Sequence, residues 1–283
     1  MRAYNVSGYC LLLVHAIISA LLAPPWLGPW MGLLFGMLYM LVLWFLTGVY
    51  VSDILHMGIA HRALDFKPWF TQTLTLTQNI VGVYIDPNSW VRRHRKHHAH
   101  ADREGDPSKV PGETMWQMMM RPFVVKEVIP EPRDPIFTTW PLRLVASSVF
   151  GVISTVTTYA ILYLLVRDWL YALALWISVR LILMWGYLVI NYWSHDRRFG
   201  QRRYEDDDES VNLDSWIAIV GTFSGSWHNN HHHAPHFLRL SHDDSEFDFG
   251  FMTVRWLKRL GVVNASSSGA HIPPGSPLKE VGL

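Results

Sequence analysis

The sequence predicts an all-α polytopic membrane protein, with four transmembrane helices in two hairpins and a cytoplasmic helical cap that holds a two-metal site. Three observations carry this prediction. Half of the 283 residues are hydrophobic, the apolar residues gather in four long segments, and clusters of histidine lie just outside those segments. Long apolar segments are typical of helices that cross a bilayer, and histidine is the commonest protein ligand for transition metals.

The segments that we interpret as spans are about residues 9–23, 30–51, 144–166 and 169–190. The last three reach the roughly 20 residues that a helix needs to cross the hydrocarbon core. The first is short and follows a basic residue, as in a secretory signal peptide. However, the Ala-Pro-Pro-Trp sequence at 23–26 predicts a turn rather than a cleavage site. We therefore interpret the first segment as a retained helix.

Charge predicts the orientation of the spans. The two short connections, 24–29 and 167–168, carry a single basic residue, Arg167, whereas Lys and Arg crowd into the other polar segments. By the positive-inside rule, both termini and all histidine clusters lie on the cytoplasmic side. The short termini, with no organelle signal, favour a bacterial inner membrane. The net charge of +1 gives no reason to expect a nucleic-acid partner.

These elements predict one integral-membrane domain over residues 1–264. The spans form its membrane part, and residues 52–141 and 191–264 form the cytoplasmic cap. The Ser-, Gly- and Pro-rich stretch 265–283 is predicted to be a flexible tail. The acidic run 205–209 is interpreted as a solvated loop.

Two histidine clusters share the spacing His-x-x-His-His, and a third pair precedes them. On an α-helix, positions i, i+3 and i+4 fall within about 100° of arc, so each triplet is predicted to project from one stripe. The only cysteine, Cys10, lies in an apolar segment, so the metal ligands must be nitrogen and oxygen. The clusters are His56 and His61; His94, His97 and His98; and His228, His231 and His232.

The first pair does not fit a regular helix. His56 and His61 are five residues apart, which places them about 140° apart around an α-helix. Either the end of this helix departs from α geometry, or the two residues serve different metals. The second option favours a two-metal site. A further candidate pair follows the fourth span, where Asn191 and His195 are predicted to share a face at i and i+4.

The alternative for any one cluster is a surface tract that binds metal adventitiously; three clusters on one side of the membrane make this alternative weak. His15 is interpreted as hydrogen-bonded within the bundle. Arg180, in the middle of span four, is expected to face the protein interior or to snorkel towards the interface; it could position a substrate or bond a backbone carbonyl. His100, His233 and His236 could extend the site but are interpreted as neighbours of it or as surface residues, and His242 and His271 as surface residues.

Metal-binding histidines need partners for their second ring nitrogen. Five acidic residues lie close to the clusters in sequence and could orient them, although each could equally be an ordinary loop or capping acid. They are Asp53, Asp65, Asp102, Asp106 and Asp196.

From about Asp53 to Leu260 the chain resembles the membrane fatty acid desaturases, especially the stearoyl-CoA type and the bacterial acyl-lipid branch. The matching motifs are the H-x4-H of 56–61 with the following Arg-Ala-Leu-Asp-Phe-Lys, the HRKHHAHADREGDP of 94–107, the Asn-x-x-x-His of 191–195 and the WHNNHH of 227–232. Some positions depart from the family pattern: Ser-Gly-Ser stands at 224–226 where Gly-Glu-Gly is common, and His-Ala-Pro-His at 233–236 replaces Ala-Phe-Pro. No departure removes a histidine of the motifs.

The resemblance implies a two-iron centre with O2 as co-substrate and a separate electron donor, such as a ferredoxin, a rubredoxin or a cytochrome b5-like protein with its reductase. It implies a fatty acyl substrate, carried by CoA or by a lipid, that enters an apolar tunnel and acquires a cis double bond. The implied iron ligands are His56, His61, His94, His97, His98, His195, His228, His231 and His232, with Asn191 acting through a water.

Two other functions remain open. A membrane hydroxylase for alkanes, sterols or carotenoids uses similar histidine motifs and yields an alcohol instead of an alkene. A non-catalytic membrane protein that binds or transports metal is expected to carry polar ligands inside its spans. Here the clusters lie outside the spans, which counts against the transport alternative.

Overall fold

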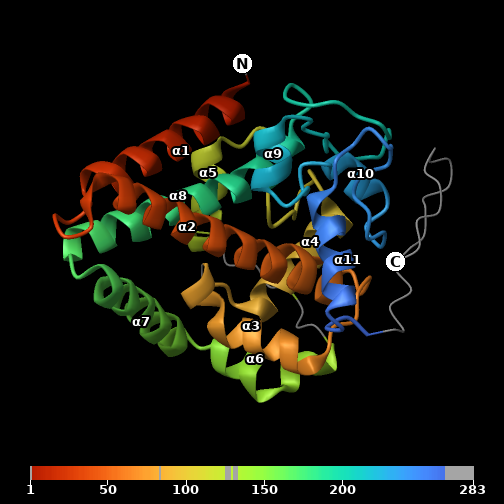
Figure 1. Cartoon of the computed structure of the whole chain (residues 1–283). Helices are drawn as coiled ribbons and strands as arrows, with labels where there is room; N and C mark the ends of the chain where they lie inside the picture. The colour runs from red at the N-terminus through yellow and green to blue at the C-terminus, as the bar shows by residue number, and fades with distance from the viewer. Residues whose placement is uncertain (1, 83, 125–128, 130–132, 265–283) are drawn as a thin grey trace.

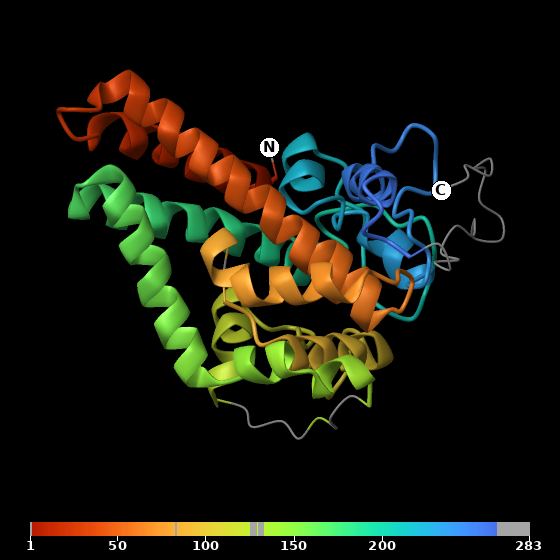
Figure 2. The ribbon, with the colours of Figure 1, turned by 60° about the horizontal axis from the view of Figure 1, so that its bottom comes forward.

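The computed structural model describes residues 2–82, 84–124, 129 and 133–264. The predicted tail 265–283 lies outside the described residues. The described part of the chain is helical and contains no β-strand, only isolated bridges between loops. Figures 1 and 2 show four long helices that extend from a compact cap of shorter ones.

The four long helices confirm the predicted spans, with different ends. They are α1 (Ala3–Leu21), α2 (Gly28–Gly48), α7 (Ser148–Val166) and α8 (Trp169–Asn191). All four are long and apolar enough to cross a membrane, and the second and fourth extend further, to Ala60 and His195. Helices α1 and α2 form one hairpin and α7 and α8 the other, and α1 also packs against α8. The chain is thus an integral membrane protein.

The sequence explains where these helices begin. Helix α1 starts six residues before the predicted span because polar residues at its start do not interrupt the helix. Helix α7 begins at Ser148, four residues later than predicted. The Ser147 hydroxyl accepts a hydrogen bond from the Phe150 amide and caps this helix. Similarly, Asp168 accepts from the Tyr171 amide at the start of α8.

Small and polar residues hold the membrane helices close together. A side chain at Gly36 of α2 would meet Ser19 of α1, with its first carbon only 2.1 Å from the Ser19 hydroxyl. His15 of α1 bonds the Ser178 hydroxyl at 2.8 Å and the Gly36 carbonyl at 3.0 Å. The prediction that His15 is hydrogen-bonded inside the bundle is therefore confirmed.

Helix α2 continues directly into a π-helix, η1 (Val49–Ala60), which packs against α4 and α11. Its hydrogen bonds run from residue i to i+5, so it is wider than an α-helix. Gly48 has no side chain, so the Phe223 ring can lie against the junction of α2 and η1. A Cβ atom at position 48 would be 2.2 Å from that ring. The second span therefore extends into the histidine site as one continuous rod.

The remaining helices form the cap. α3 lies between α2, α6 and α7, and the predicted basic helix around the second histidine cluster is confirmed as α4. The cap elements are α3 (Pro68–Val81), α4 (Pro87–His100), α5 (Met115–Val124), η2 (Pro135–Thr138), α6 (Trp140–Val145), η3 (Trp193–His195), α9 (Trp216–Gly221), α10 (His228–His233) and α11 (Phe249–Arg259).

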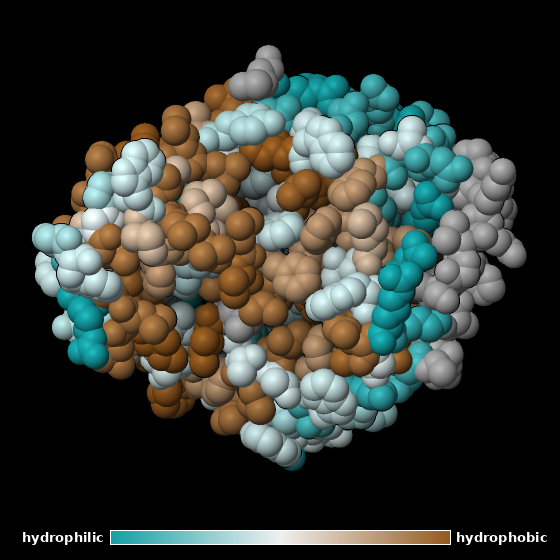
Figure 3. Space-filling model, viewed as in Figure 1, coloured by the Kyte–Doolittle hydropathy of each residue, from teal (hydrophilic) through white to brown (hydrophobic). Residues whose placement is uncertain are grey.

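The surface agrees with a membrane location. In Figure 3 the face over α1, α2 and α7 is mainly hydrophobic, whereas the side that carries α10 and α11 is largely hydrophilic. Large tryptophans lie exposed near the helix ends, where aromatic side chains meet lipid headgroups. At the short connections they are Trp26, Trp30 and Trp169, and in the cap they include Trp69, Trp140, Trp216 and Trp256.

Candidate metal centre

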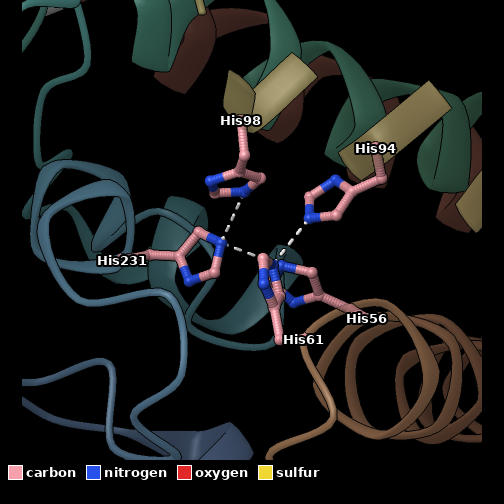
Figure 4. A group of neighbouring side chains, drawn as sticks. All are labelled: His56, His61, His94, His98 and His231. Atoms are coloured by element: carbon pink, nitrogen blue, oxygen red, sulfur yellow. Dashed lines mark hydrogen bonds between the residues drawn. The ribbon is translucent and has the colours of Figure 1, made fainter. Parts of the chain in front are cut away.

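Nine histidines from four segments of the chain meet in two groups, each tight enough to hold a metal ion. Within each group, one ring nitrogen of every member lies within 4.8 Å of those of the others. The five-histidine group, shown in Figure 4, is His56, His61, His94, His98 and His231. The four-histidine group is His97, His195, His228 and His232.

Each His-x-x-His-His motif divides between the two groups. On α4, His94 and His98 point to the five-histidine group, whereas His97 belongs to the other. On α10, His231 belongs to the five-histidine group, and His228 and His232 to the four-histidine group. Both triplets lie on α-helices, as the predicted stripe requires, but the rings of each triplet belong to two groups rather than one. Both helices lie between the two groups. The three side chains of a triplet spread over an arc of the helix, so one helix contributes ligands to both groups.

The π-helix explains the first pair. The His61 amide donates to the His56 carbonyl over 3.0 Å, which is the i+5 bond of a π turn. This turn brings the two rings to 4.8 Å between centroids, within one group. Of the two sequence-based options, departure from α geometry is correct, and the assignment of these two residues to different metals is wrong.

The hydrogen-bond partners of the four-histidine group favour binding of a cation. Asp102 lies 2.7 Å from Nδ1 of His195, and since a carboxylate only accepts, that nitrogen carries the proton. The Nε2 of His195 therefore presents a lone pair, and it lies 2.9 Å from Nε2 of His228. His228 is itself bonded to the Gly225 carbonyl. Two lone pairs at this distance repel each other unless a positive ion lies between them.

The same arrangement recurs at the other members of this group. His97 bonds Asp106 and His232 bonds Asp208 through Nδ1, at 2.9 and 2.8 Å. Their Nε2 atoms are buried and have no hydrogen-bond partner. Four lone pairs thus face one small volume. Imidazole nitrogens bound about 2.1 Å from a divalent ion lie about 3 Å apart when adjacent, which fits the observed spacing.

The five-histidine group has matching distances. Its Nε2 atoms lie 3.0 Å apart for His56 and His231, 2.8 Å for His61 and His94, and 3.1 Å for His98 and His231. The dashed lines in Figure 4 mark these three contacts. An all-nitrogen donor set suits iron, zinc, copper or nickel.

Burial keeps these imidazoles in the form that binds metal. Desolvation first, and neighbouring histidines second, lower the pKa of His94, His98, His231 and His232 well below the ordinary value. The pKa of His61 falls to about 2 for the same reasons. Neutral imidazole is the ligating form.

The carboxylate partners were only partly predicted. Asp102 and Asp106 do orient histidines, but Asp196 pairs with Arg198 instead and Asp65 bonds Asn264. Asp208 was missed, because the acidic run 205–209 was interpreted as a solvated loop. No sequence signal separates the acids of this run; in the structure Asp208 is 11% exposed, whereas the neighbouring Asp207 is 95% exposed.

The acidic loop is tied to the cap by Arg202, which donates to the carbonyls of Asp206, Asp208 and Ser210. It also reaches the other side of the site, where the Glu209 amide donates to Asp102 at 2.9 Å. The loop therefore supplies one partner of His232 and supports one partner of His195.

The other residues predicted to lie at or near the site make different contacts. The Asn191 amide donates to the Tyr187 carbonyl at 2.9 Å, and α8 ends there, so His195 lies on η3 rather than on the same regular face. His236 bonds the His61 carbonyl at 3.1 Å. His233 stacks on Tyr204 with 3.7 Å between ring centroids.

His242 is buried and bonds the Tyr204 hydroxyl at 3.0 Å, so its interpretation as a surface residue is wrong. His271 lies outside the described residues.

A cavity of about 640 Å³ opens onto both groups and runs along α8 into the membrane region. Five of the histidines line it, and beyond them its wall is mainly apolar. This volume is typical of a small-molecule site. The wall along α8 is made by Asn191, Ile190, Tyr187, Met184, Leu183, Arg180 and Trp176. Trp44, Val51, Phe223, Leu238 and Phe251 are among the apolar residues facing it.

The fold and the site define a class: integral membrane proteins in which histidines at the ends of apolar helices can hold metal ions beside an apolar cavity. The family model for fatty acid desaturase matches residues 24–243. The chain belongs to the fatty acid desaturase family, and it is an oxidoreductase of that family.

Named relatives agree with this assignment. The chain is 27% identical over 230 residues to an sn-1 stearoyl-lipid 9-desaturase of Anabaena variabilis, covering 79% of this chain and 80% of the relative. It is 26% identical over 231 residues to an sn-2 palmitoyl-lipid 9-desaturase of Nostoc sp. (strain 36), covering 76% of each. It is also 28% identical over 254 residues to a hex-5-enoyl-[acyl-carrier protein] acetylenase of Moorena producens, covering 78% of this chain and 73% of the relative.

Proposed function

We propose that this protein is an O2-dependent acyl-lipid desaturase that introduces a cis double bond into a saturated acyl chain at a two-iron centre. The observation that carries the proposal is the continuity of the apolar cavity with both histidine groups. The relatives named for stearoyl-lipid and palmitoyl-lipid support a lipid-bound chain rather than an acyl-CoA.

The five-histidine group would hold one iron and the four-histidine group the other, with Asn191 contributing through a water. Asp102, Asp106 and Asp208 keep the proton on Nδ1 of their histidines and so direct Nε2 inward. Bound iron supplies the activation of O2 that removal of hydrogen from an unactivated methylene requires, which no side chain can provide.

The cavity would position the reacting carbons. Apolar side chains enclose the acyl chain and exclude water, and a displacement of about 1 Å can cost orders of magnitude in rate. The shape of the cavity between α8 and η1 therefore selects the position of the double bond. Electrons would come from a separate ferredoxin, rubredoxin or cytochrome b5-like protein.

The positive-inside charge pattern supports an active site on the cytoplasmic face, and the relatives from Anabaena and Nostoc support a bacterial inner membrane. Residues 1–264 would form one integral-membrane domain, since the membrane helices and the cap share the histidine site.

The test is a lipid fatty acid profile from a host without an aerobic desaturase, measured by gas chromatography–mass spectrometry after derivatisation. We expect a new alkene with the wild-type chain and none with His228→Ala. His100→Ala is the matched control, because His100 lies on α4 beside the site but is exposed. A new hydroxylated lipid without an alkene would establish a hydroxylase instead. An alkene formed equally by His228→Ala would refute the proposed centre.

A further inference from the structure

One charged side chain in the cavity has no part in the chemistry described above. Arg180 lies at the middle of α8, eleven residues from Trp169 and eleven from Asn191, and it lines the same cavity as the histidines. Eleven residues of α-helix correspond to about 16 Å, so Arg180 lies deep in the membrane region, far from the metal groups. An ionisable residue at this depth is costly and typically marks a binding site.

The contacts of Arg180 are all neutral. It donates to the Trp176 carbonyl at 3.2 Å and weakly to the Asn79 carbonyl at 3.5 Å. Its guanidinium lies 3.9 Å over the Trp176 ring. No carboxylate of the described residues forms an ion pair with it, and the ionisable group that acts on it is the Tyr39 hydroxyl, through a side-chain hydrogen bond. The expectation that Arg180 faces the interior and bonds a backbone carbonyl is thus correct, but its charge is not neutralised.

The surroundings of Arg180 offer donors and few acceptors. The indole N–H of Trp176 is buried and has no hydrogen-bond partner. The Asn79 amide donates to Ser154 and Thr155, and the Asn79 carbonyl already accepts from Thr158 at 3.0 Å. A guanidinium with five N–H groups and an indole N–H therefore face this end of the cavity together. The chemical complement of such a site is an anionic oxygen acceptor.

The geometry points to a carboxylate site at the inner end of the cavity, formed by Arg180 and Trp176, which binds the end of an aliphatic chain. This inference rests on the cavity being the acyl site of the proposed function. A plain methyl end would leave the charge of the guanidinium with neutral partners alone in an apolar environment, which is unfavourable. The carboxylate has two chemical sources: a second carboxyl group at the far end of an esterified chain, or the carboxyl group of a free fatty acid that enters first.

The test is equilibrium binding to the purified full-length protein without reductant, so that no turnover occurs. One pair of probes is a glycerolipid esterified with a hexadecanedioyl chain and the same glycerolipid esterified with a palmitoyl chain, which differ only at the chain end; the bulk of the headgroup fixes their orientation. The second pair is palmitate and methyl palmitate, which tests entry of a free carboxyl group. Variants are Arg180→Met, of similar length without charge, and Arg143→Met, an exposed control.

We expect the wild-type and Arg143→Met proteins to prefer the carboxylate-ended member of one pair by about tenfold or more, as a charge-assisted hydrogen bond provides. In Arg180→Met this preference should disappear, while the affinity for the other member is kept. Preference within the first pair identifies the far end of an esterified chain, and preference within the second pair alone identifies the free acid.

Equal affinity within both pairs in the wild type overturns the inference, even if Arg180→Met fails to fold. A preference that survives in Arg180→Met overturns it too. The lipid profile described above separates this result from the proposed function, because desaturation of a plain chain does not depend on the carboxylate preference.

Discussion

The carboxylate of Asp208 lies 2.8 Å from Nδ1 of His232, and the side chain of its neighbour Asp207 lies in solvent. Substitutions at these two adjacent acids can therefore distinguish two contributions to metal binding: the orientation of a histidine by a carboxylate, and the negative charge near the site. The Asp208 contact leaves Nε2 of His232 buried, without a partner and facing the other histidines of its group.

We therefore expect Asp208→Asn to lower metal affinity or activity by about 10- to 100-fold, because the amide no longer fixes the proton on Nδ1. The measurement is iron content by mass spectrometry together with the lipid profile. Asp207→Asn removes the same charge one residue away and should leave both unchanged. Equal losses in the two variants would show that charge alone, rather than orientation of His232, matters.

At the end of the π-helix, Arg95 donates to the carbonyls of Ile59 and Ala60 at 2.6 and 3.0 Å and also pairs with Asp134. This pairing is the main reason that the pKa of Asp134 lies below its usual value. Arg95→Met should free the end of η1 and displace His61, so that metal is lost mainly from the five-histidine group.

The iron-to-protein ratio in Arg95→Met should fall to roughly half, with a loss of stability of about 1.5–3 kcal/mol for the broken charged hydrogen bonds. Arg103→Met, which removes a more exposed arginine shortly after α4, serves as the control. Retention of full iron content in Arg95→Met would disprove this role for the arginine.

At the junction of α2 and η1, Gly48→Ala should destabilise the protein. An added carbon would lie 2.2 Å from the Phe223 ring, and overpacking of this kind typically costs about 1–3 kcal/mol. The midpoint of thermal unfolding should drop by several degrees. The double variant with Phe223→Leu makes room for the methyl group and should recover part of the loss; failure to recover would mean that the clash is absorbed elsewhere.

Metal-free protein should lose stability as the pH falls. The folded-state pKa of His61, about 2, and those of His94, His98, His231 and His232 lie below the unfolded value of 6.5. Above pH 6.5 neither state is protonated and these groups have no effect. Below it, only the unfolded state takes up protons, so each such histidine lowers the free energy of unfolding by about 1.4 kcal/mol per pH unit.

Thermal unfolding of chelator-treated protein between about pH 7.5 and about pH 4.5 measures this dependence. Variants that lack one of these histidines should show a shallower slope. A stability that stays constant over this range would indicate that the histidines are protonated in the folded state.

The sequence by itself determined the membrane class, the four spans and the nine histidines. The length of an apolar segment indicates directly whether it can cross a membrane. The repeated His-x-x-His-His spacing is rare enough to identify α4 and α10 as parts of the site before any contact is known. It also predicted the buried, bonded state of His15 and the inward position of Arg180, because a polar group inside a span must find a partner.

Only the tertiary structure decided which histidines share a site. The spacing of the three histidines in a triplet is compatible with binding to one metal or to two. The division of each triplet between two groups depends on the position of α4 and α10 between those groups. Likewise, His56 and His61 meet because packing against α4 and α11 and the bonds from Arg95 hold η1 in a π conformation, which local sequence rules do not predict. Asp208 could not be distinguished from Asp207 by composition, since the two differ only in which faces a histidine contributed by another helix.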